Sequence, residues 1–247
     1  MTNRRIFIKN TSLGVVGLSF LSKPIFADNE IKKITILHTN DMHSRIEPFS
    51  SGNYKGFGGM AQRSSIIKEI RKKEKNVLLF DGGDIFQGTP YFNYFGGELE
   101  FKLMSEMKYD AAVLGNHDFD NGINGLKKQL KHANFPFLIS NYDFKNTILK
   151  DQFNPYKIFI KDNIKVGVFG VGIELKGLVP KELYKETVYL DPIENSKFYG
   201  NKLKNELGCD LVICLSHLGL QYENNKISDI TLAKKSKFID LIIGGHT

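Results

Sequence analysis

The sequence is poor in cysteine, and this scarcity excludes several kinds of protein. Its two cysteines, Cys209 and Cys214, lie in one apolar run, where an extended backbone would place them about 16 Å apart. That separation is too large for a disulfide, and no histidine or third cysteine stands beside them at zinc-ligand spacing. We therefore expect both to be buried packing residues, which excludes a disulfide-stapled fold and a cysteine-based structural zinc site.

The sequence also lacks an apolar run long enough to cross a bilayer. Its N-terminal apolar stretch, Leu13 to Leu21, is too short to span, but it follows a basic start and precedes Ala27, a plausible cleavage point. We interpret residues 1–27 as an export signal and expect no membrane span after its removal. The segment from Arg4 to Lys9 resembles a twin-arginine signal, with an ordinary secretory signal as the alternative. The expected location is the periplasm.

A strong charge of one sign is absent from the body of the chain. The formal net charge is +7, but residues 1–27 hold four basic residues and no acidic one, which leaves +3 for the rest. The basic run from Lys68 to Lys75 is interrupted by Glu69 and Glu74 and is typical of a solvated helix face. We expect no nucleic-acid partner, although a weak positive bias suits an anionic small molecule.

What the sequence does contain is an alternation of short apolar runs and longer helical patterns, in a chain of 247 residues that can bury one large core. This order predicts an α/β fold with one domain over residues 28–247. The predicted strands are Ile34 to Leu37, Val77 to Phe80, Ala111 to Leu114, Phe137 to Ile139, Lys165 to Val171, Leu211 to Leu215 and Ile239 to Ile243. The predicted helices are Met60 to Lys72, Leu99 to Met107, Ile123 to Ala133, Asn195 to Leu207 and Ile230 to Lys237.

Two further patterns refine this prediction. Tyr156 to Ile160 and Ile164 to Phe169 flank the turn residues Asp162 and Asn163, which predicts an antiparallel hairpin and hence mixed sheets. The stretch from Gly172 to Pro192 has no clear period, and we interpret it as a loop between layers.

The strongest functional signal is the chemistry that follows the apolar runs. Five of the predicted strands lead directly into aspartate, asparagine or histidine, in the segments His38 to His43, Asp81 to Asp84, Gly115 to Asp120, Ser216 to His217 and Gly244 to Thr247. Active sites of α/β sheets gather at the carboxyl ends of strands, so these groups are expected to converge.

Carboxylate, carboxamide and imidazole groups together suit manganese, iron or zinc. A carboxylate on a glycine-flanked turn, such as Asp84, can approach two ions at once, and paired ions are a known device for attacking phosphate esters. Each motif alone has a plainer interpretation: Asp41 to His43 is compatible with a simple turn, and His217 with a buried core histidine. The joint pattern favours a metal site.

In combination these motifs resemble the calcineurin-like metallophosphoesterases, and more narrowly their 5'-nucleotidase branch. The resemblance rests on Asp41-x-His43, Gly82-Gly83-Asp84, Gly115-Asn116-His117-Asp118, Ser216-His217 and Gly244-Gly245-His246, and it spans residues 34–247. It implies two packed mixed β-sheets flanked by helices, a four-layer sandwich.

The resemblance also implies a role for each site residue. Asp84 would bridge two divalent ions, with Asp41 and His43 serving the first. Asn116, His217 and His246 would serve the second. Asn116 and His117 would contact the substrate, His117 would stabilise developing charge or protonate the leaving oxygen, and Asp120 would hold its imidazole in position.

The sequence departs from the family after His246, where the family has one more ligand two positions on and, in many relatives, a C-terminal domain that holds the nucleobase. Three interpretations are open: a longer gene product, a separate partner chain that carries the missing part, or the terminal carboxylate of Thr247 as a substitute ligand.

The function expected from these observations is metal-dependent hydrolysis of nucleotides or related phosphate esters outside the cytoplasm. The alternatives are the thiosulfohydrolase of sulfur oxidation, which shares the fold and binds two manganese ions, and a catalytically silent metal-binding fragment.

Overall fold

The computed structural model describes residues 31–247, so the predicted export signal lies outside the described residues. The fold is α/β, as predicted, and its strands form two larger sheets and one small pair. The first sheet has the order β1 (Thr35–Thr39), β2 (Val77–Asp81), β3 (Ala111–Ala112), all parallel. The second has the order β5 (Tyr156–Lys161), β6 (Ile164–Val171), β8 (Leu211–Ser216), β9 (Leu241–Ile243), with only β5 antiparallel. The small pair joins β4 (Tyr142–Asp143) and β7 (Val188–Tyr189) antiparallel.

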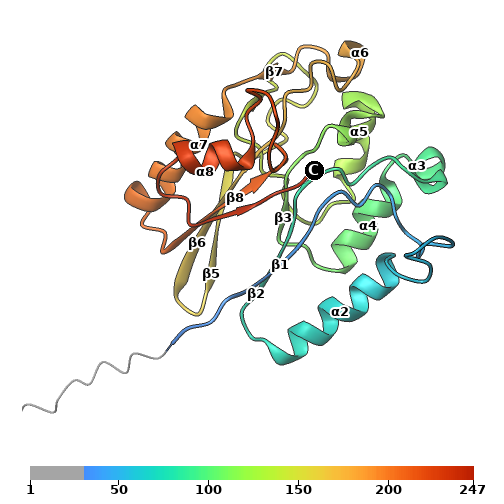
Figure 1. Cartoon of the computed structure of the whole chain (residues 1–247), viewed down its shortest axis with the longest axis horizontal. Coiled ribbons are helices and arrows are strands. Elements are labelled where there is room, and N and C mark those ends of the chain that lie inside the picture. The colour runs from blue at the N-terminus through green and yellow to red at the C-terminus, as the bar shows by residue number, and fades with distance from the viewer. Residues whose placement is uncertain (1–30) are drawn as a thin grey trace, which may run out of the picture. The chain divides into compact units, whose positions relative to one another are not determined.

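Helices cover the outer faces of both larger sheets (Figure 1). On the side of the first sheet lie α2 (Met60–Lys73), α3 (Pro90–Phe95), α4 (Glu98–Glu106) and α5 (Gly122–Leu130). On the side of the second lie α7 (Pro192–Asn201) and α8 (Asp229–Lys235), while the short α6 (Lys181–Tyr184) lies near β7. No helix of residues 31–247 is long and apolar enough to cross a membrane.

The sheets face each other across the main apolar core. All five residues of β2 are buried, and the rings of Phe80 on β2 and Phe159 on β5 lie 5.8 Å apart between their centroids. On β8, Ile213 belongs to this core, whereas Val212 and Cys214 belong to a second cluster that includes Ile193 of α7 and Leu232 of α8. Strands buried on both faces are uniformly apolar, which explains why these runs stand out in the sequence.

The predicted hairpin and the predicted state of the cysteines are confirmed. β5 pairs antiparallel with β6, and Asp162 and Asn163 at the turn have φ values of 51° and 63°, as a tight hairpin turn requires. Cys209 and Cys214 are both buried and free.

Some predicted elements need correction. The stretch from Gly172 to Pro192 is not wholly a loop, because it contains α6 and β7, which are too short to show a period. The apolar run from Phe137 to Ile139 forms only isolated bridges, with Phe137 opposite Ala112 and Leu138 opposite Asn154. The helix predicted to reach Leu207 ends in a π-helical turn over Lys202–Glu206, and α3 was missed because its six residues carry no repeating pattern.

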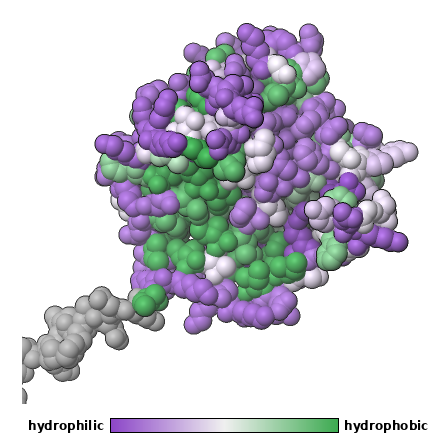
Figure 2. Space-filling view, viewed as in Figure 1, coloured by the Kyte–Doolittle hydropathy of each residue, from purple (hydrophilic) through white to green (hydrophobic). Residues whose placement is uncertain are grey.

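β1 lies at one edge of the first sheet, and β9 lies at one edge of the second. Figure 2 shows a band of apolar surface over the region in which Figure 1 labels β1 and β8, the strand that pairs with β9. Leu241 of β9 is among the exposed apolar residues of the chain.

Candidate metal centre

The strand ends converge as the sequence predicts. The residues after β1, β2, β8 and β9 form two groups that could each hold a metal ion, Asp41, His43 and Asp84 in one, and Asp84, His217 and His246 in the other. Within each group, one ligand atom from every residue lies within 4.8 Å of the others. Asp84 belongs to both groups, so a single carboxylate stands between two potential ion positions.

The first group, called here the open half, is accessible to solvent. Nε2 of His43 lies 4.0 Å from Oδ1 of Asp41 and 3.9 Å from Oδ2 of Asp84. The side chains of His43 and Asp41 are 37% and 24% exposed. The Asp41 carboxylate is oriented by Nδ2 of Asn40 and by the backbone N–H of His246, which donate to it.

The second group, called here the buried half, is enclosed. The side chain of His217 is 0% exposed, and its Nε2 lies 3.1 Å from Oδ2 of Asp84. Its other ring nitrogen, Nδ1, lies 2.6 Å from the carbonyl oxygen of Gly82, which must accept a hydrogen bond from it. This contact fixes the ring orientation and turns Nε2 toward Asp84.

Oδ1 of Asn116 is also buried, and it has no hydrogen-bond partner among residues 31–247. Leaving such atoms unsatisfied is costly, so buried orphans call for an explanation. An imidazole nitrogen, a carboxamide oxygen and a shared carboxylate are the ligand groups that a divalent transition ion accepts. The residues present therefore fit the divalent metal ions that the motif resemblance implies.

The proximity of Asp84 and His217 also changes their ionisation in the metal-free protein. Burial acts to lower the pKa of His217, but the Asp84 carboxylate outweighs burial and raises this pKa to about 9. Burial acts to raise the pKa of Asp84, yet the hydrogen bond and charge of His217 lower it overall. Burial lowers the pKa of His246, and the charge of His217 adds to the effect. In the metal-free protein, a proton between His217 and Asp84 thus supplies the positive charge that a metal cation would supply.

The backbone at the ligands is strained. Asp41, His43, Asp84 and His246 have φ values of 50°, 45°, 56° and 78°, a left-handed region that residues other than glycine rarely adopt. Each such residue costs of order 1–3 kcal/mol, and these conformations cluster at functional sites. The nearby Gly115 is required for another reason, because a Cβ there would lie 2.1 Å from Oδ1 of Asp84.

His117 and Asp120 form a pair beside the open half. They lie at the ends of a 3-10 turn, and Nδ1 of His117 is 2.7 Å from Oδ2 of Asp120. The His117 ring packs edge-on against His43, with 5.1 Å between centroids, and its backbone N–H donates to Oδ1 of Asp84. Burial acts to lower the pKa of His117, but Asp120 and then Asp84 raise it overall.

The sequence also suggested Asn116 and Thr247 as ligands. Asn116 is buried, and it directly precedes the His117 N–H that contacts Asp84. The Thr247 hydroxyl, for its part, accepts a hydrogen bond from the backbone N–H of Leu220. Asp118 was not among the predicted site residues, and the structure buries it completely against the loops of Asp84 and Gly115. The sequence offered one signal for this residue: an acidic side chain in the polar segment that directly follows a buried strand.

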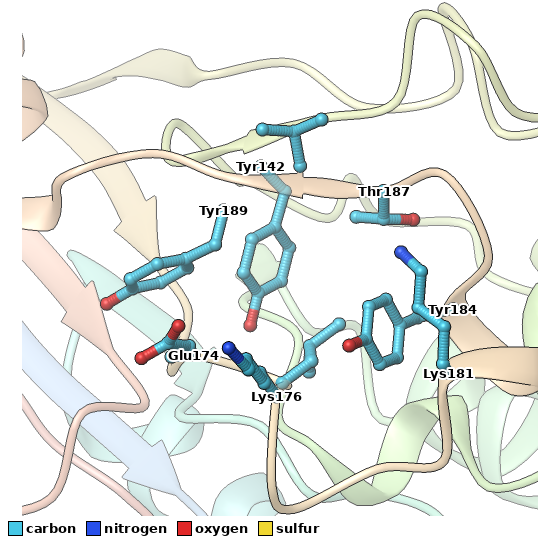
Figure 3. Close-up of a pocket in the computed structure, with 9 residues that line it drawn as sticks. Tyr142, Glu174, Lys176, Lys181, Tyr184, Thr187 and Tyr189 are labelled. Carbon is cyan, nitrogen blue, oxygen red and sulfur yellow. The ribbon is translucent and has the colours of Figure 1, made fainter.

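A cavity of about 290 Å³ lies at the end of β6, between the segment Glu174–Lys176, α6 and the small β4–β7 pair (Figure 3). Its lining combines phenols, lysines and a carboxylate: Tyr142, Tyr184, Tyr189, Lys176, Lys181 and Glu174. None of the predicted metal ligands lines it. The ring of Tyr142 also contacts that of Phe119, the residue after Asp118, with 5.9 Å between centroids.

Comparison with known proteins agrees with this geometry. The chain matches the model of the calcineurin-like phosphoesterase family over residues 34–247. It is 41% identical over 225 residues to the snake venom 5'-nucleotidase of Crotalus adamanteus, covering 87% of this chain and 37% of that protein. It is 39% identical over 227 residues to the 5'-nucleotidase of Vibrio cholerae, covering 87% of this chain and 40% of that protein.

Solved structures give the same result. The 5'-nucleotidase precursor from Thermus thermophilus superposes with a TM-score of 0.77 at 32% identity, covering 86% of this chain and 41% of that one. A sulfate thiohydrolase from Thermus thermophilus superposes with a TM-score of 0.74 at 18% identity, covering 88% and 49%, a likeness that shows the fold alone. The chain spans about two fifths of the length of the curated relatives it matches.

Proposed function

Because this chain belongs to the calcineurin-like phosphoesterase family, we propose that it hydrolyses phosphate esters with two divalent metal ions, and that its substrates are nucleotides. The observation that carries this proposal is the Asp84 carboxylate, which is shared by two ligand groups at the carboxyl edge of the sheets. The 5'-nucleotidase relatives support the choice of nucleotides.

In this proposal Asp41, His43 and Asp84 hold one ion, and Asp84, Asn116, His217 and His246 hold the other. When bound, such ions polarise phosphate oxygens and lower the pKa of water toward neutrality. The contact between Nδ1 of His217 and the Gly82 carbonyl presents Nε2 as a ligand. The N–H of His246 holds the Asp41 carboxylate in place, so each half of the centre helps to orient the other.

His117 acts on the substrate and does not hold an ion. Its Nδ1 is engaged by Asp120, which leaves Nε2 as the ring nitrogen available to the leaving group. Because its pKa is raised overall despite burial, the ring keeps a proton to a higher pH than a free histidine does. It can therefore donate that proton to the leaving oxygen or stabilise charge on phosphate, with Asn116 contacting the same phosphate.

We also propose that the protein is exported through its residues 1–27. The venom origin of one relative supports a location outside the cytoplasm. Fractionation of cells that express the full chain tests this proposal: material in the periplasm that is lost on Arg4→Lys and Arg5→Lys together supports a twin-arginine route, and retention in the cytoplasm of the unchanged chain contradicts export.

The experiment that tests the function is phosphate release from adenosine 5'-monophosphate by the purified chain, with manganese added and with chelator present. Manganese-dependent release that Asp84→Asn abolishes supports the proposal. One bound ion or none, with no release from any of a panel of nucleotides, would instead favour the silent metal-binding module. Release of sulfate from a cysteine-linked thiosulfonate would favour the thiosulfohydrolase.

A further inference from the structure

Asp118 is a completely buried carboxylate next to the metal centre, with 0% of its surface exposed. It belongs to neither ligand group. Its two oxygens accept four backbone hydrogen bonds. Oδ2 accepts from the N–H groups of Asp84 at 3.1 Å and Gly115 at 2.8 Å, and Oδ1 accepts from those of Ile85 at 2.9 Å and Phe86 at 3.1 Å.

These four N–H groups come from two different loops. Asp84, Ile85 and Phe86 follow β2, whereas Gly115 follows β3 and directly precedes Asn116. β2 and β3 themselves pair at only two positions, Phe80 with Ala111 and Asp81 with Ala112. The hydrogen bonds between β2 and β3 therefore end before either loop begins. Beyond that point, the Asp118 carboxylate joins the two loops.

The two loops are also in close contact where Asp118 joins them. A Cβ at Gly83 would lie 2.7 Å from the backbone nitrogen of Gly115, and a Cβ at Gly115 would lie 2.5 Å from that of Asp84. Because the loops are this close, and because Asp84 has a φ of 56°, the position of one loop relative to the other must be held by specific contacts. A buried polar group costs free energy unless it is hydrogen-bonded, and the four N–H groups supply these bonds to the Asp118 carboxyl group.

We propose that Asp118 is a positioning residue for the metal centre. It holds the Asp84 backbone in its left-handed conformation and ties the Asp84 loop to the loop that carries Asn116 and His117. The Asp84 carboxylate is thereby kept between the two ligand groups. This inference rests on the proposed two-ion function. It assigns Asp118 no contact with an ion or a substrate.

The substitution Asp118→Asn tests this role at nearly constant size. Asparagine keeps one acceptor oxygen but turns an NH₂ donor toward N–H donors, so it cannot satisfy all four. In the full chain titrated with Mn²⁺, we expect the second ion to bind about 10- to 100-fold more weakly, the range found for outer-shell partners of metal ligands. The electron paramagnetic resonance spectrum should change from that of a coupled ion pair to that of isolated ions.

The matched control is Asp191→Ala, since the Asp191 carboxylate also accepts two backbone N–H bonds, from Ile193 and Glu194, at the start of α7. It should lower the melting temperature and leave Mn²⁺ binding and the coupled spectrum unchanged. A purely structural role for Asp118 predicts the same pattern for Asp118→Asn, and that result would overturn the inference.

A measurement on the unsubstituted chain covers the case in which Asp118→Asn does not fold. The amides of Asp84, Ile85, Phe86 and Gly115 should exchange slowly with deuterium in the presence of chelator, because Asp118 and not the ion holds them. Rapid exchange of these amides without metal would refute the role. If the unsubstituted chain binds two ions that Asp118→Asn loses, yet releases no phosphate from nucleotides, the positioning role stands and the proposed function fails.

Discussion

The two halves of the metal centre share Asp84 but differ in how they hold their other ligands. In the buried half, His217 is 0% exposed, and a backbone carbonyl fixes its ring. In the open half, the His43 side chain is 37% exposed and lies about 4 Å from both carboxylates. Electrostatic attraction is stronger where water is excluded. We infer that the buried half binds its ion more tightly and that the open half is the one that exchanges ions with solvent.

The largest effect is expected from Asp84→Asn, which tests whether the halves share one carboxylate. The substitution removes the charge common to both groups, so both ions should be lost and phosphate release should fall to background. The measurement is metal content after gel filtration, alongside turnover. Retention of one tightly bound ion would show that one half does not depend on Asp84.

His117→Ala tests whether a residue that contacts His43 and the shared Asp84 is itself a ligand. It should lower turnover by about 10² to 10⁴-fold, the usual range for a lost general acid or base, because the group that serves the leaving oxygen is removed. Both ions should remain, as counted by elemental analysis. Loss of an ion would make His117 a ligand and contradict its assignment here.

The matched substitutions His217→Ala and His43→Ala compare the halves directly. Each substitution removes one imidazole, so a difference between their effects on Mn²⁺ binding arises from the surroundings of the two histidines and not from the ligand type. We expect His217→Ala to weaken the tighter of the two Mn²⁺ binding steps by at least about 100-fold, more than the loss of an outer-shell partner does, and His43→Ala to weaken only the looser step. Equal effects in a calorimetric titration would break the comparison.

The pH dependence of ion binding should be the smallest effect, and it should separate the halves. The pKa of His217 is raised to about 9 in the metal-free protein by Asp84, against the effect of burial, and an ion requires the neutral ring. The stabilising proton is present at neutral pH and is lost as pH rises through about 9. Binding to the buried half should therefore weaken about tenfold for each unit below that pH. Titrations at several pH values with counted proton release check this, and a pH-independent tight step would contradict it.

The polar strand ends could be predicted from the sequence because each has a local pattern, an apolar run followed directly by polar residues. A buried strand such as β2 is an uninterrupted apolar run, and Asp84 follows it after two glycines. The convergence of His217 with Asp84, 133 positions apart in the chain, followed from the rule that strand ends meet at one edge of a sheet.

What the sequence could not supply depends on contacts between distant segments. The exposure difference between His43 and His217 arises from packing, since in the sequence each is simply a histidine in a polar segment that follows an apolar run. The role that we propose for Asp118 depends on N–H groups of a loop more than thirty positions away. Short elements such as α6 and the β4–β7 pair are stabilised by their surroundings and carry no period.

The edge strands β1 and β9, with the apolar surface around them, have a consequence for handling the protein. A strand at the edge of a sheet offers backbone groups to any extended peptide, and apolar surface beside it strengthens the attraction. The isolated chain should therefore self-associate as its concentration rises, by sheet extension between copies and independently of metal. Stocks for the titrations above are best kept dilute, with light scattering as the check on each sample.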